Sequence, residues 1–265
     1  MMKFIKKLTF KVEWASATNS RQELQKPNED RLFFDEAKGI FILLDGVTRV
    51  HSEYHEHPYE SASADVGDIF IDEVYQFMLE HIDDSEPETI LRGAIATANA
   101  KIKDYRTKKT KSEWNFYPST LGFVGLIRDR MLHYVGVGDC MGAIIRRNAK
   151  ILLGKEWALE ALDKQIITKR ERYNTYCNHP ENELSYTVFN GDDLVMAGLN
   201  CSFIDLYEGD TLFIVSDGIG DYIKYEKSKN LVIQSPEQII ARSSKYDAPP
   251  YAEYADDKTI IKISF

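Results

Sequence analysis

Two apolar segments of the sequence each end in an aspartate followed by a glycine. One reads FILLDG and ends at Asp45-Gly46, and the other reads LFIVSDG and ends at Asp217-Gly218. A short apolar run of this kind is typical of a strand that is buried on both faces. A carboxylate buried at the end of such a strand is costly unless a cation or hydrogen-bond donors lie beside it. The two segments therefore predict two carboxylates that converge on one site.

Three further acidic motifs stand at tight turns or next to expected strands: Asn28-Glu29-Asp30, Gly138-Asp139 and Asp256-Asp257. Carboxylate oxygens suit hard cations such as Mg²⁺ or Mn²⁺. A glycine after an aspartate also lets the backbone approach closely, so that a carbonyl oxygen can serve as a ligand. For any single motif, ordinary turn chemistry is the simpler explanation of Asp-Gly. Five such motifs, two of them on long apolar strands, favour a metal site.

The hydrophobic pattern predicts an α+β chain. Strands are predicted at 6–16, 31–35, 39–44, 119–127, 131–137, 142–147, 150–153, 211–216 and 258–265. Helices are predicted at 60–82, 85–104 and 155–170, with shorter helical turns near 219–226 and 236–244. The apolar stripes of the first two helices are Val66, Phe70, Val74, Met78 and Ile82, and Leu91, Ile95, Ala98 and Ile102. Helices between blocks of strands predict packed sheets with helices outside.

Residues 172–209 are irregular and polar in this interpretation. That is long for a connection within a compact domain, so we predict a functional flap there. Tyr173, Tyr176 and Tyr186 within it could touch a substrate or simply pack as aromatic side chains.

The composition narrows the class of protein. A chain of 265 residues with 43% hydrophobic content can form one large domain or two small ones. The net charge of -9 repels phosphate backbones and argues against nucleic-acid binding. No apolar run approaches the ~20 residues that span a bilayer, and we see no signal peptide. Three cysteines at long spacing, without a CxxC pair, fit a reduced cytoplasm and argue against a zinc knuckle.

Six motifs stand in the order found in one known family. They are NEDR at 28–31, LLDG at 43–46, STLGF at 119–123, VGVGDC at 135–140, IVSDGIGD at 214–221 and ADDKT at 255–259. From about residue 10 to its end, the sequence resembles the metal-dependent, type 2C Ser/Thr protein phosphatases of bacterial type. The resemblance implies a four-layer α-β-β-α sandwich, with two antiparallel sheets flanked by helix pairs. It also implies that residues 1–265 form a single phosphatase domain, with a flap subdomain at about 172–209.

The resemblance assigns roles to individual residues. Asp45 resembles the carboxylate that bridges two metals, and the carbonyl of Gly46 resembles a ligand of the second metal. Asp217 and Asp256 resemble further ligands of the first metal. Asp256 is preferred to Asp257 because the family motif places the ligand first.

Two more positions complete the implied site. Asp30, with Glu29, resembles the carboxylate that holds the second metal through water. Asp139 resembles the acidic residue that, with the equivalent of Asp217, holds a weak third metal in some members. The resemblance thus implies two Mn²⁺ or Mg²⁺ ions and a weaker third. Two cations about 4 Å apart lower the pKa of a bridging water and neutralise the phosphoryl oxygens during in-line attack, without a covalent enzyme intermediate.

The sequence departs from the family pattern at two positions. Val47 stands where the family often has a histidine, so water would protonate the leaving group. Gln25 stands where the family has a phosphate-binding arginine. Lys26, Arg21 or Arg49 could replace that arginine, and the sequence does not choose among them.

Two other patterns carry competing chemistry. Cys140–Arg146 matches the Cys-x5-Arg loop of cysteine-dependent phosphatases, but the five residues between them are mostly apolar and strand-like. Asp139 would also raise the thiol pKa, so we interpret the match as coincidence. The segment HSEYHEH at 51–57 could bind a transition metal, but Pro58 and the absence of a cysteine partner favour a solvated loop that could border the cleft.

The sequence therefore predicts a cytoplasmic, monomeric protein Ser/Thr phosphatase that acts on phosphoproteins and binds neither nucleic acid nor membrane. Two alternatives stay open. One is a catalytically weak relative that binds phosphoproteins as a regulator, which the missing arginine and histidine favour. The other is a metal-dependent phosphohydrolase of small molecules.

Overall fold

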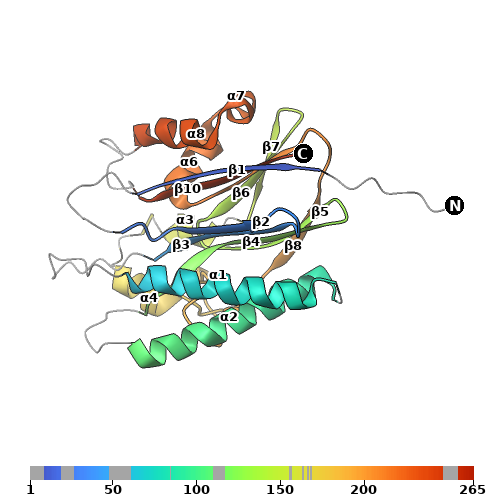
Figure 1. The fold of residues 1–265 in the computed structure, drawn as a ribbon. Helices are drawn as coiled ribbons and strands as arrows, with labels where there is room; N and C mark the ends of the chain where they lie inside the picture. Colours follow the sequence, from blue (N-terminus) through green and yellow to red (C-terminus); the bar gives the residue numbers. More distant parts are fainter. Residues whose placement is uncertain are drawn as a thin grey trace.

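Two antiparallel sheets between layers of helices form the body of the protein (Figure 1). The computed structural model describes residues 9–18, 27–47, 61–83, 85–109, 117–154, 157–162, 164–165, 167, 169–246 and 256–265. The predicted four-layer α-β-β-α sandwich is confirmed.

Each sheet has five strands. The first sheet has the order β1 (Lys11–Ala17), β10 (Lys258–Ser264), β9 (Thr211–Val215), β6 (Met141–Arg146) and β7 (Ala149–Leu153). The second has the order β2 (Arg31–Asp35), β3 (Ile40–Gly46), β4 (Thr120–Arg128), β5 (Met131–Val137) and β8 (Cys201–Asp205). The helices are α1 (Ala62–His81), α2 (Pro87–Lys109), α3 (Trp157–Leu162), α4 (Lys169–Tyr176), α5 (Val195–Gly198), α6 (Asp217–Tyr225), α7 (Ser228–Ile233) and α8 (Pro236–Ser243), followed by a 3-10 turn at Ser244–Tyr246.

The four strands predicted between residues 119 and 153 form two hairpins, one in each sheet. Asp129 and Arg130 turn β4 into β5, and Arg147 and Asn148 turn β6 into β7. All four residues have positive φ, the conformation that two-residue hairpin turns require for the strands to twist correctly. Because the chain passes from one sheet to the other between β5 and β6, Asp139 lies at the crossover.

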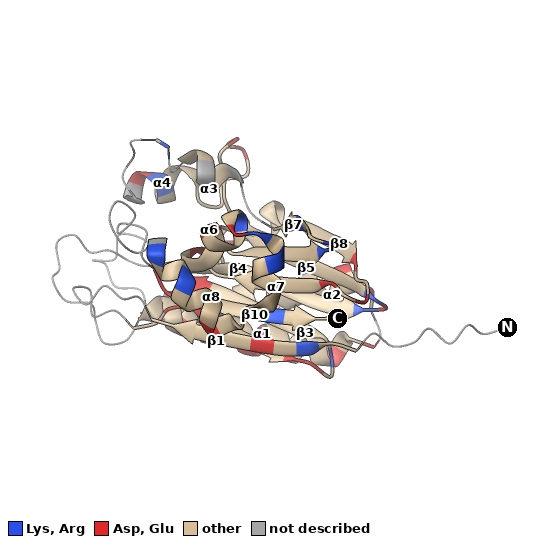
Figure 2. Ribbon diagram, turned by 90° about the horizontal axis from the view of Figure 1, so that it is seen from above, with Lys and Arg blue, Asp and Glu red and all other residues tan. Residues whose placement is uncertain are grey.

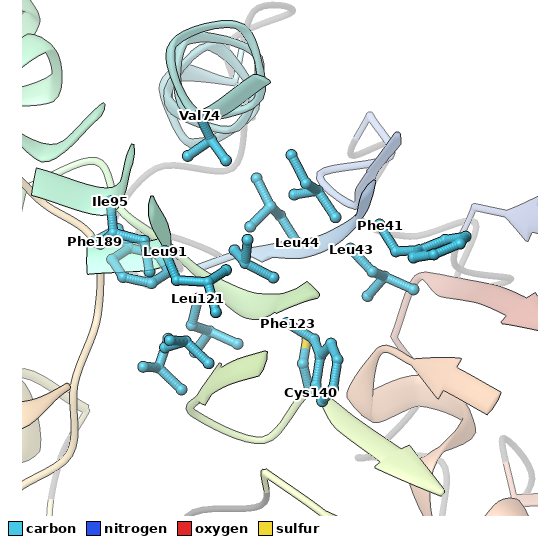
Figure 3. Packing of buried hydrophobic residues seen from close by; sticks show 14 of the residues in the cluster. Phe41, Leu43, Leu44, Val74, Leu91, Ile95, Leu121, Phe123, Cys140 and Phe189 are labelled. Atoms are coloured by element: carbon cyan, nitrogen blue, oxygen red, sulfur yellow. The ribbon is translucent and has the colours of Figure 1, made fainter. Parts of the chain in front are cut away.

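The main core fills the space between the sheets and beneath the pair α1–α2. All predicted stripe residues of both helices are buried. Phe70 of α1 stacks on Phe189, with ring centroids 4.4 Å apart. Figure 3 shows Val74 of α1 pointing toward the strands, and Leu91 and Ile95 of α2 beside Phe189. The periodicity of the two helices therefore predicts their packing against the second sheet correctly.

The short helices α6, α7 and α8 lie on the outer face of the first sheet, and α6 and α8 pack against each other there as a pair. Helices α6 and α8 pack on its strands, and Ile219, Tyr222 and Ile239 enter a second, smaller core there. Lys262 of β10 donates to the carbonyl oxygens of Val232 and Gln234 at the end of α7. These two bonds hold the end of α7 against the sheet.

The region after β7 differs from its prediction. The single helix expected at 155–170 is two short helices, α3 and α4. The segment 172–209, expected to be irregular, contains most of α4, helix α5 and the edge strand β8, which pairs with β5. The strand escaped prediction because it is partly exposed and lacks an apolar-polar alternation: Phe203, its largest side chain, is 70% exposed. Among the described residues, no helix is long and apolar enough to cross a bilayer.

Candidate active site

Three carboxylates meet at one end of the sandwich. Asp45, Asp139 and Asp217 each offer an oxygen, and these oxygens lie within 4.8 Å of one another. Asp45 lies near the end of β3 in the second sheet, Asp139 at the crossover between the sheets, and Asp217 directly after β9 of the first sheet, as the first residue of α6. The two strand-end aspartates predicted to converge do converge, because both sheets end at the same place.

These aspartates line a pocket with a volume of about 160 Å³. Asp256 and Gly46 line it as well. The rest of the lining is Val47, Leu121, Leu159, Arg172, Tyr173, Tyr186 and Val188. One part of the pocket is thus acidic, and the other is largely apolar and aromatic.

The two glycines that follow Asp45 and Asp217 allow close backbone approaches. A Cβ atom on Gly46 would lie 2.7 Å from the Cβ atom of Glu29, and one on Gly218 would lie 2.2 Å from the carbonyl oxygen of Asp257. Any larger residue at either position would push neighbouring chain segments apart. The Asp-Gly motifs are therefore required by packing at the site and not only by turn formation.

The two candidates Asp256 and Asp257 occupy different surroundings. Asp256 lines the pocket. Asp257 is 1% exposed, and its Oδ2 accepts a hydrogen bond of 2.9 Å from the backbone N–H of Glu29. Of the two, only Asp256 presents its side chain to the other pocket aspartates.

Asp30 and Glu29 lie beneath the pocket and do not line it. Asp30 Oδ2 accepts from Ser216 Oγ at 2.7 Å, and Ser216 Oγ in turn accepts from the backbone N–H of Thr259 at 2.9 Å. Glu29 accepts from Ser61 Oγ at the start of α1. Asp30 therefore supports the turn that carries Asp217, and Glu29 supports the start of a helix.

The carboxylates of the pocket raise one another's pKa. Burial, and then the charges of Asp217 and Asp30, raise the pKa of Asp45 well above its usual value. Burial and Asp139 raise the pKa of Asp217 in the same way. Among the described residues, Asp30 Oδ1 and Asp217 Oδ1 are buried without a hydrogen-bond partner. Buried oxygens that lack donors and repel one another fit a hard divalent cation.

One wall of the pocket is the extended segment 185–188. Tyr186 and Val188 line the aspartate pocket, whereas Ser185 and Thr187 line a second pocket of about 440 Å³, which has no charged side chain among its described lining residues. Asn178, just after α4, bonds Val188 through both its side-chain oxygen and its side-chain nitrogen. The segment is therefore a partition between two pockets, and α4 holds it in place.

Comparisons with known proteins identify the fold. No known family profile and no curated protein sequence matches the chain. Among solved structures, the Mycobacterium tuberculosis serine/threonine phosphatase PstP/Ppp matches at 17% identity with a TM-score of 0.63, over 97% of this chain and 99% of that one. The S. agalactiae serine/threonine phosphatase matches at 17% identity with a TM-score of 0.63, over 96% of this chain and 99% of that one. The catalytic domain of PstP in complex with two manganese ions matches at 16% identity with a TM-score of 0.63, over 96% of this chain and 97% of that one.

The chain has the fold of the bacterial serine/threonine phosphatases. The resemblance drawn from the six sequence motifs is thereby confirmed at the level of the fold, which is what identities this low establish.

Within this phosphatase fold, Cys140 belongs to the core. It is fully buried, and burial together with Asp45 and Asp139 raises the pKa of its thiol well above the usual value. Arg146 ends strand β6, where it pairs with Asp210 at 2.7 Å. The residues that follow Cys140 in the Cys-x5-Arg match thus form strand β6 and not a phosphate-binding loop, as predicted.

The predicted phosphate-binding residues Lys26, Arg21 and Arg49 lie outside the described residues, as does the segment at 51–57. The structure instead brings Arg172 to the pocket, a residue that the sequence analysis missed. No motif marks it, because it stands in a short helix of mixed charge far along the chain from the aspartates.

Proposed function

We propose that the protein is a metal-dependent Ser/Thr protein phosphatase of the type 2C family, which hydrolyses phosphoserine and phosphothreonine in phosphoproteins. The observation that carries the proposal is the cluster of Asp45, Asp139 and Asp217 in a pocket of this fold. One domain spans residues 1–265 in this proposal, and its flap lies at about 172–209.

The pocket residues fit the roles that the resemblance implies. Asp45, the carbonyl of Gly46, Asp217 and Asp256 would hold two Mn²⁺ or Mg²⁺ ions, and Asp139 would contribute to a weaker third site. When bound, such ions lower the pKa of a water molecule and neutralise phosphoryl oxygens. PstP, of the same fold, has been solved with two manganese ions.

The surrounding residues position the carboxylates and exclude water. Ser216 donates to Asp30 and accepts from the N–H of Thr259, which fixes the turn that presents Asp217. Asp30 would thus position Asp217, in addition to the water-mediated role at the second metal that the resemblance gives to Asp30 with Glu29. Val47 lines the pocket where the family often has a histidine, and no histidine is among the described lining residues. Solvent water would therefore protonate the leaving alkoxide.

Hydrolysis of a phosphopeptide and of para-nitrophenyl phosphate, each with Mn²⁺, Mg²⁺ or chelator, tests the proposal. Asp45→Asn and Asp217→Asn keep the side-chain shape but remove a charge, so the rate should fall by orders of magnitude. Cys140→Ser should cost little, because this thiol is buried in the core and is not among the described residues that line the pocket. Circular dichroism checks the folding of each variant.

Two outcomes would end the proposal. Full activity in excess chelator after dialysis would exclude a metal mechanism. A dead Cys140→Ser variant beside active aspartate variants would restore a thiolate nucleophile.

Gln25 and Val47 favour a second candidate function, that of a phosphoprotein-binding regulator with weak catalysis. Calorimetric titration with Mn²⁺ separates the two functions. A protein that binds Mn²⁺ at the aspartates yet hydrolyses no phosphoester would be such a regulator.

A further inference from the structure

Arg172 is the basic side chain that the described structure brings to the aspartate pocket. It extends from α4 and lines the pocket together with Asp45, Asp139, Asp217 and Asp256. No other lysine or arginine among the described residues lines this pocket. Figure 2 shows α4, with its charged residues, set apart from the sheets beside α3.

The direction of the Arg172 side chain is fixed by a contact with α3. One of its terminal amino groups donates to the carbonyl oxygen of Leu159 at 3.2 Å, and Leu159 also lines the pocket. This bond uses one of the five N–H groups of a guanidinium. The side chain is therefore held against α3 by this bond while it lines the pocket.

Tyr186 connects Arg172 with the acidic part of the pocket. Burial raises the pKa of its phenol, Arg172 lowers it, and Asp139 raises it. The phenol therefore lies near enough to feel both charges. Arg172, Tyr186 and Asp139 all line the same pocket.

The charges that line the pocket are four carboxylates and one guanidinium. The four lining carboxylates carry charges that two divalent ions would balance. A bound phosphoryl group would add negative charge, which the divalent ions share with any neighbouring cation. A guanidinium matches phosphate oxygens in geometry and charge, whereas Gln25 brings no charge to the position of the family's arginine.

We infer that Arg172 binds the phosphoryl oxygens of the substrate, and that this chain therefore presents its phosphate-binding cation from the flap. The inference rests on the proposed phosphatase function. It makes Arg172 a substrate-binding residue and links the phosphate to α4.

Calorimetric titration of the Mn²⁺-loaded protein with orthophosphate tests the inference. Arg172→Ala should weaken orthophosphate binding about ten- to a hundredfold, the usual range for hydrogen bonds to a charged group. Arg172→Lys keeps the charge but loses the fork, so it should lie between the parent and Arg172→Ala. Arg242→Ala, at an exposed arginine in the last turn of α8, is the matched control and should leave binding unchanged.

The affinity for Mn²⁺ separates anion binding from a structural role. Removing a positive charge beside a cation site should leave Mn²⁺ binding unchanged or tighten it. Loss of Mn²⁺ and orthophosphate affinity by the same factor would show that Arg172 only holds the pocket together. Orthophosphate affinity within twofold of the parent would overturn the inference, and so would a parent that binds no orthophosphate. If Arg172→Ala does not fold, Arg172→Lys decides by the same measurements.

Measuring turnover in the same proteins distinguishes a failure of the inference from a failure of the proposed function. An inactive parent that binds orthophosphate through Arg172 supports the inference and overturns the phosphatase function. An active parent whose Arg172→Ala variant keeps full orthophosphate affinity does the reverse. In an active enzyme, Arg172→Ala should raise KM more than it lowers kcat.

Discussion

Replacing Asp30 by asparagine should change how the stability of the metal-free protein depends on pH. Burial raises the pKa of this carboxyl from 3.8 to about 7, against hydrogen bonds from Ser216 and Thr259 that lower it. Asp257 and Asp256 raise it further. The folded state therefore holds the Asp30 proton more tightly than the unfolded state does.

The sign of the effect follows from the two pKa values. Below pH 3.8 the carboxyl is protonated in both states and the free energy of unfolding is unaffected. As the pH rises toward 7, the unfolded chain releases the proton first, and the folded protein loses stability. About three pH units at about 1.4 kcal/mol each give a loss of about 4 kcal/mol above pH 7.

Asparagine keeps an acceptor for Ser216 Oγ but carries no charge. Its buried amide lacks assured partners, which costs about 1–3 kcal/mol at every pH. Asp30→Asn should therefore be less stable than the parent at pH 4 and more stable at pH 8. The difference between the two proteins should change by about 4 kcal/mol over that range.

Urea denaturation in chelator at pH 4, 6 and 8 measures this difference. Asp221→Asn, at an exposed aspartate of α6, is the control and should run parallel to the parent. Adding Mn²⁺ at pH 8 should stabilise the parent more than Asp30→Asn, because a bound cation attracts the negative charge of Asp30, which asparagine lacks. A difference in free energy of unfolding between the parent and Asp30→Asn that stays constant with pH would refute the reasoning, because the pKa of Asp30 would then not be raised in the folded state.

Three further changes test other parts of the structure. Asp256→Asn should weaken Mn²⁺ binding in calorimetry, whereas Asp257→Asn should mainly lower the urea midpoint, since Asp257 accepts from a backbone N–H; the reverse pattern would exchange their roles. Asn178→Ala removes the bonds that hold the pocket wall, so the ratio of phosphopeptide to small-ester turnover should change; equal losses on both substrates would count against a flap that shapes substrate choice. Phe70→Ala should destabilise the protein by about 3–5 kcal/mol in urea, because the ring is fully buried on Phe189, and a loss under 1 kcal/mol would mean that the core there collapses around the gap.

The sequence predicts the sandwich well where burial is complete. Helices α1 and α2 have unbroken apolar stripes, and strands such as β3 and β9 are apolar runs, so periodicity alone locates them. The edge strand β8 escapes because its side chains are largely exposed. The break between α3 and α4 escapes because both helices are short and the second is polar.

The residues of the candidate site also differ in how well the sequence predicts them. Asp45 and Asp217 are predictable because an aspartate at the end of a buried strand needs an explanation. Asp256 and Asp257 are adjacent and identical in type, so the sequence cannot separate them, whereas the structure does: Asp256 lines the pocket, and Asp257 accepts from the backbone N–H of Glu29. Arg172 could not be predicted, because its place at the pocket depends on how α4 packs against α3.

The position of Arg172 on α4, in the proposed flap, has a physical rationale. An arginine fixed in the sandwich beside Asp45 and Asp217 would pair with them and compete with the metal ions for the same oxygens. Arg172 is carried by α4 and donates to a carbonyl oxygen of α3, so part of its anchoring comes from a neutral group. In the proposed arrangement, the carboxylates would bind the cations and the guanidinium would bind the anion. Phosphate binding would in turn tie α4 and the wall at 185–188 to the sheets, so that substrate and flap stabilise each other.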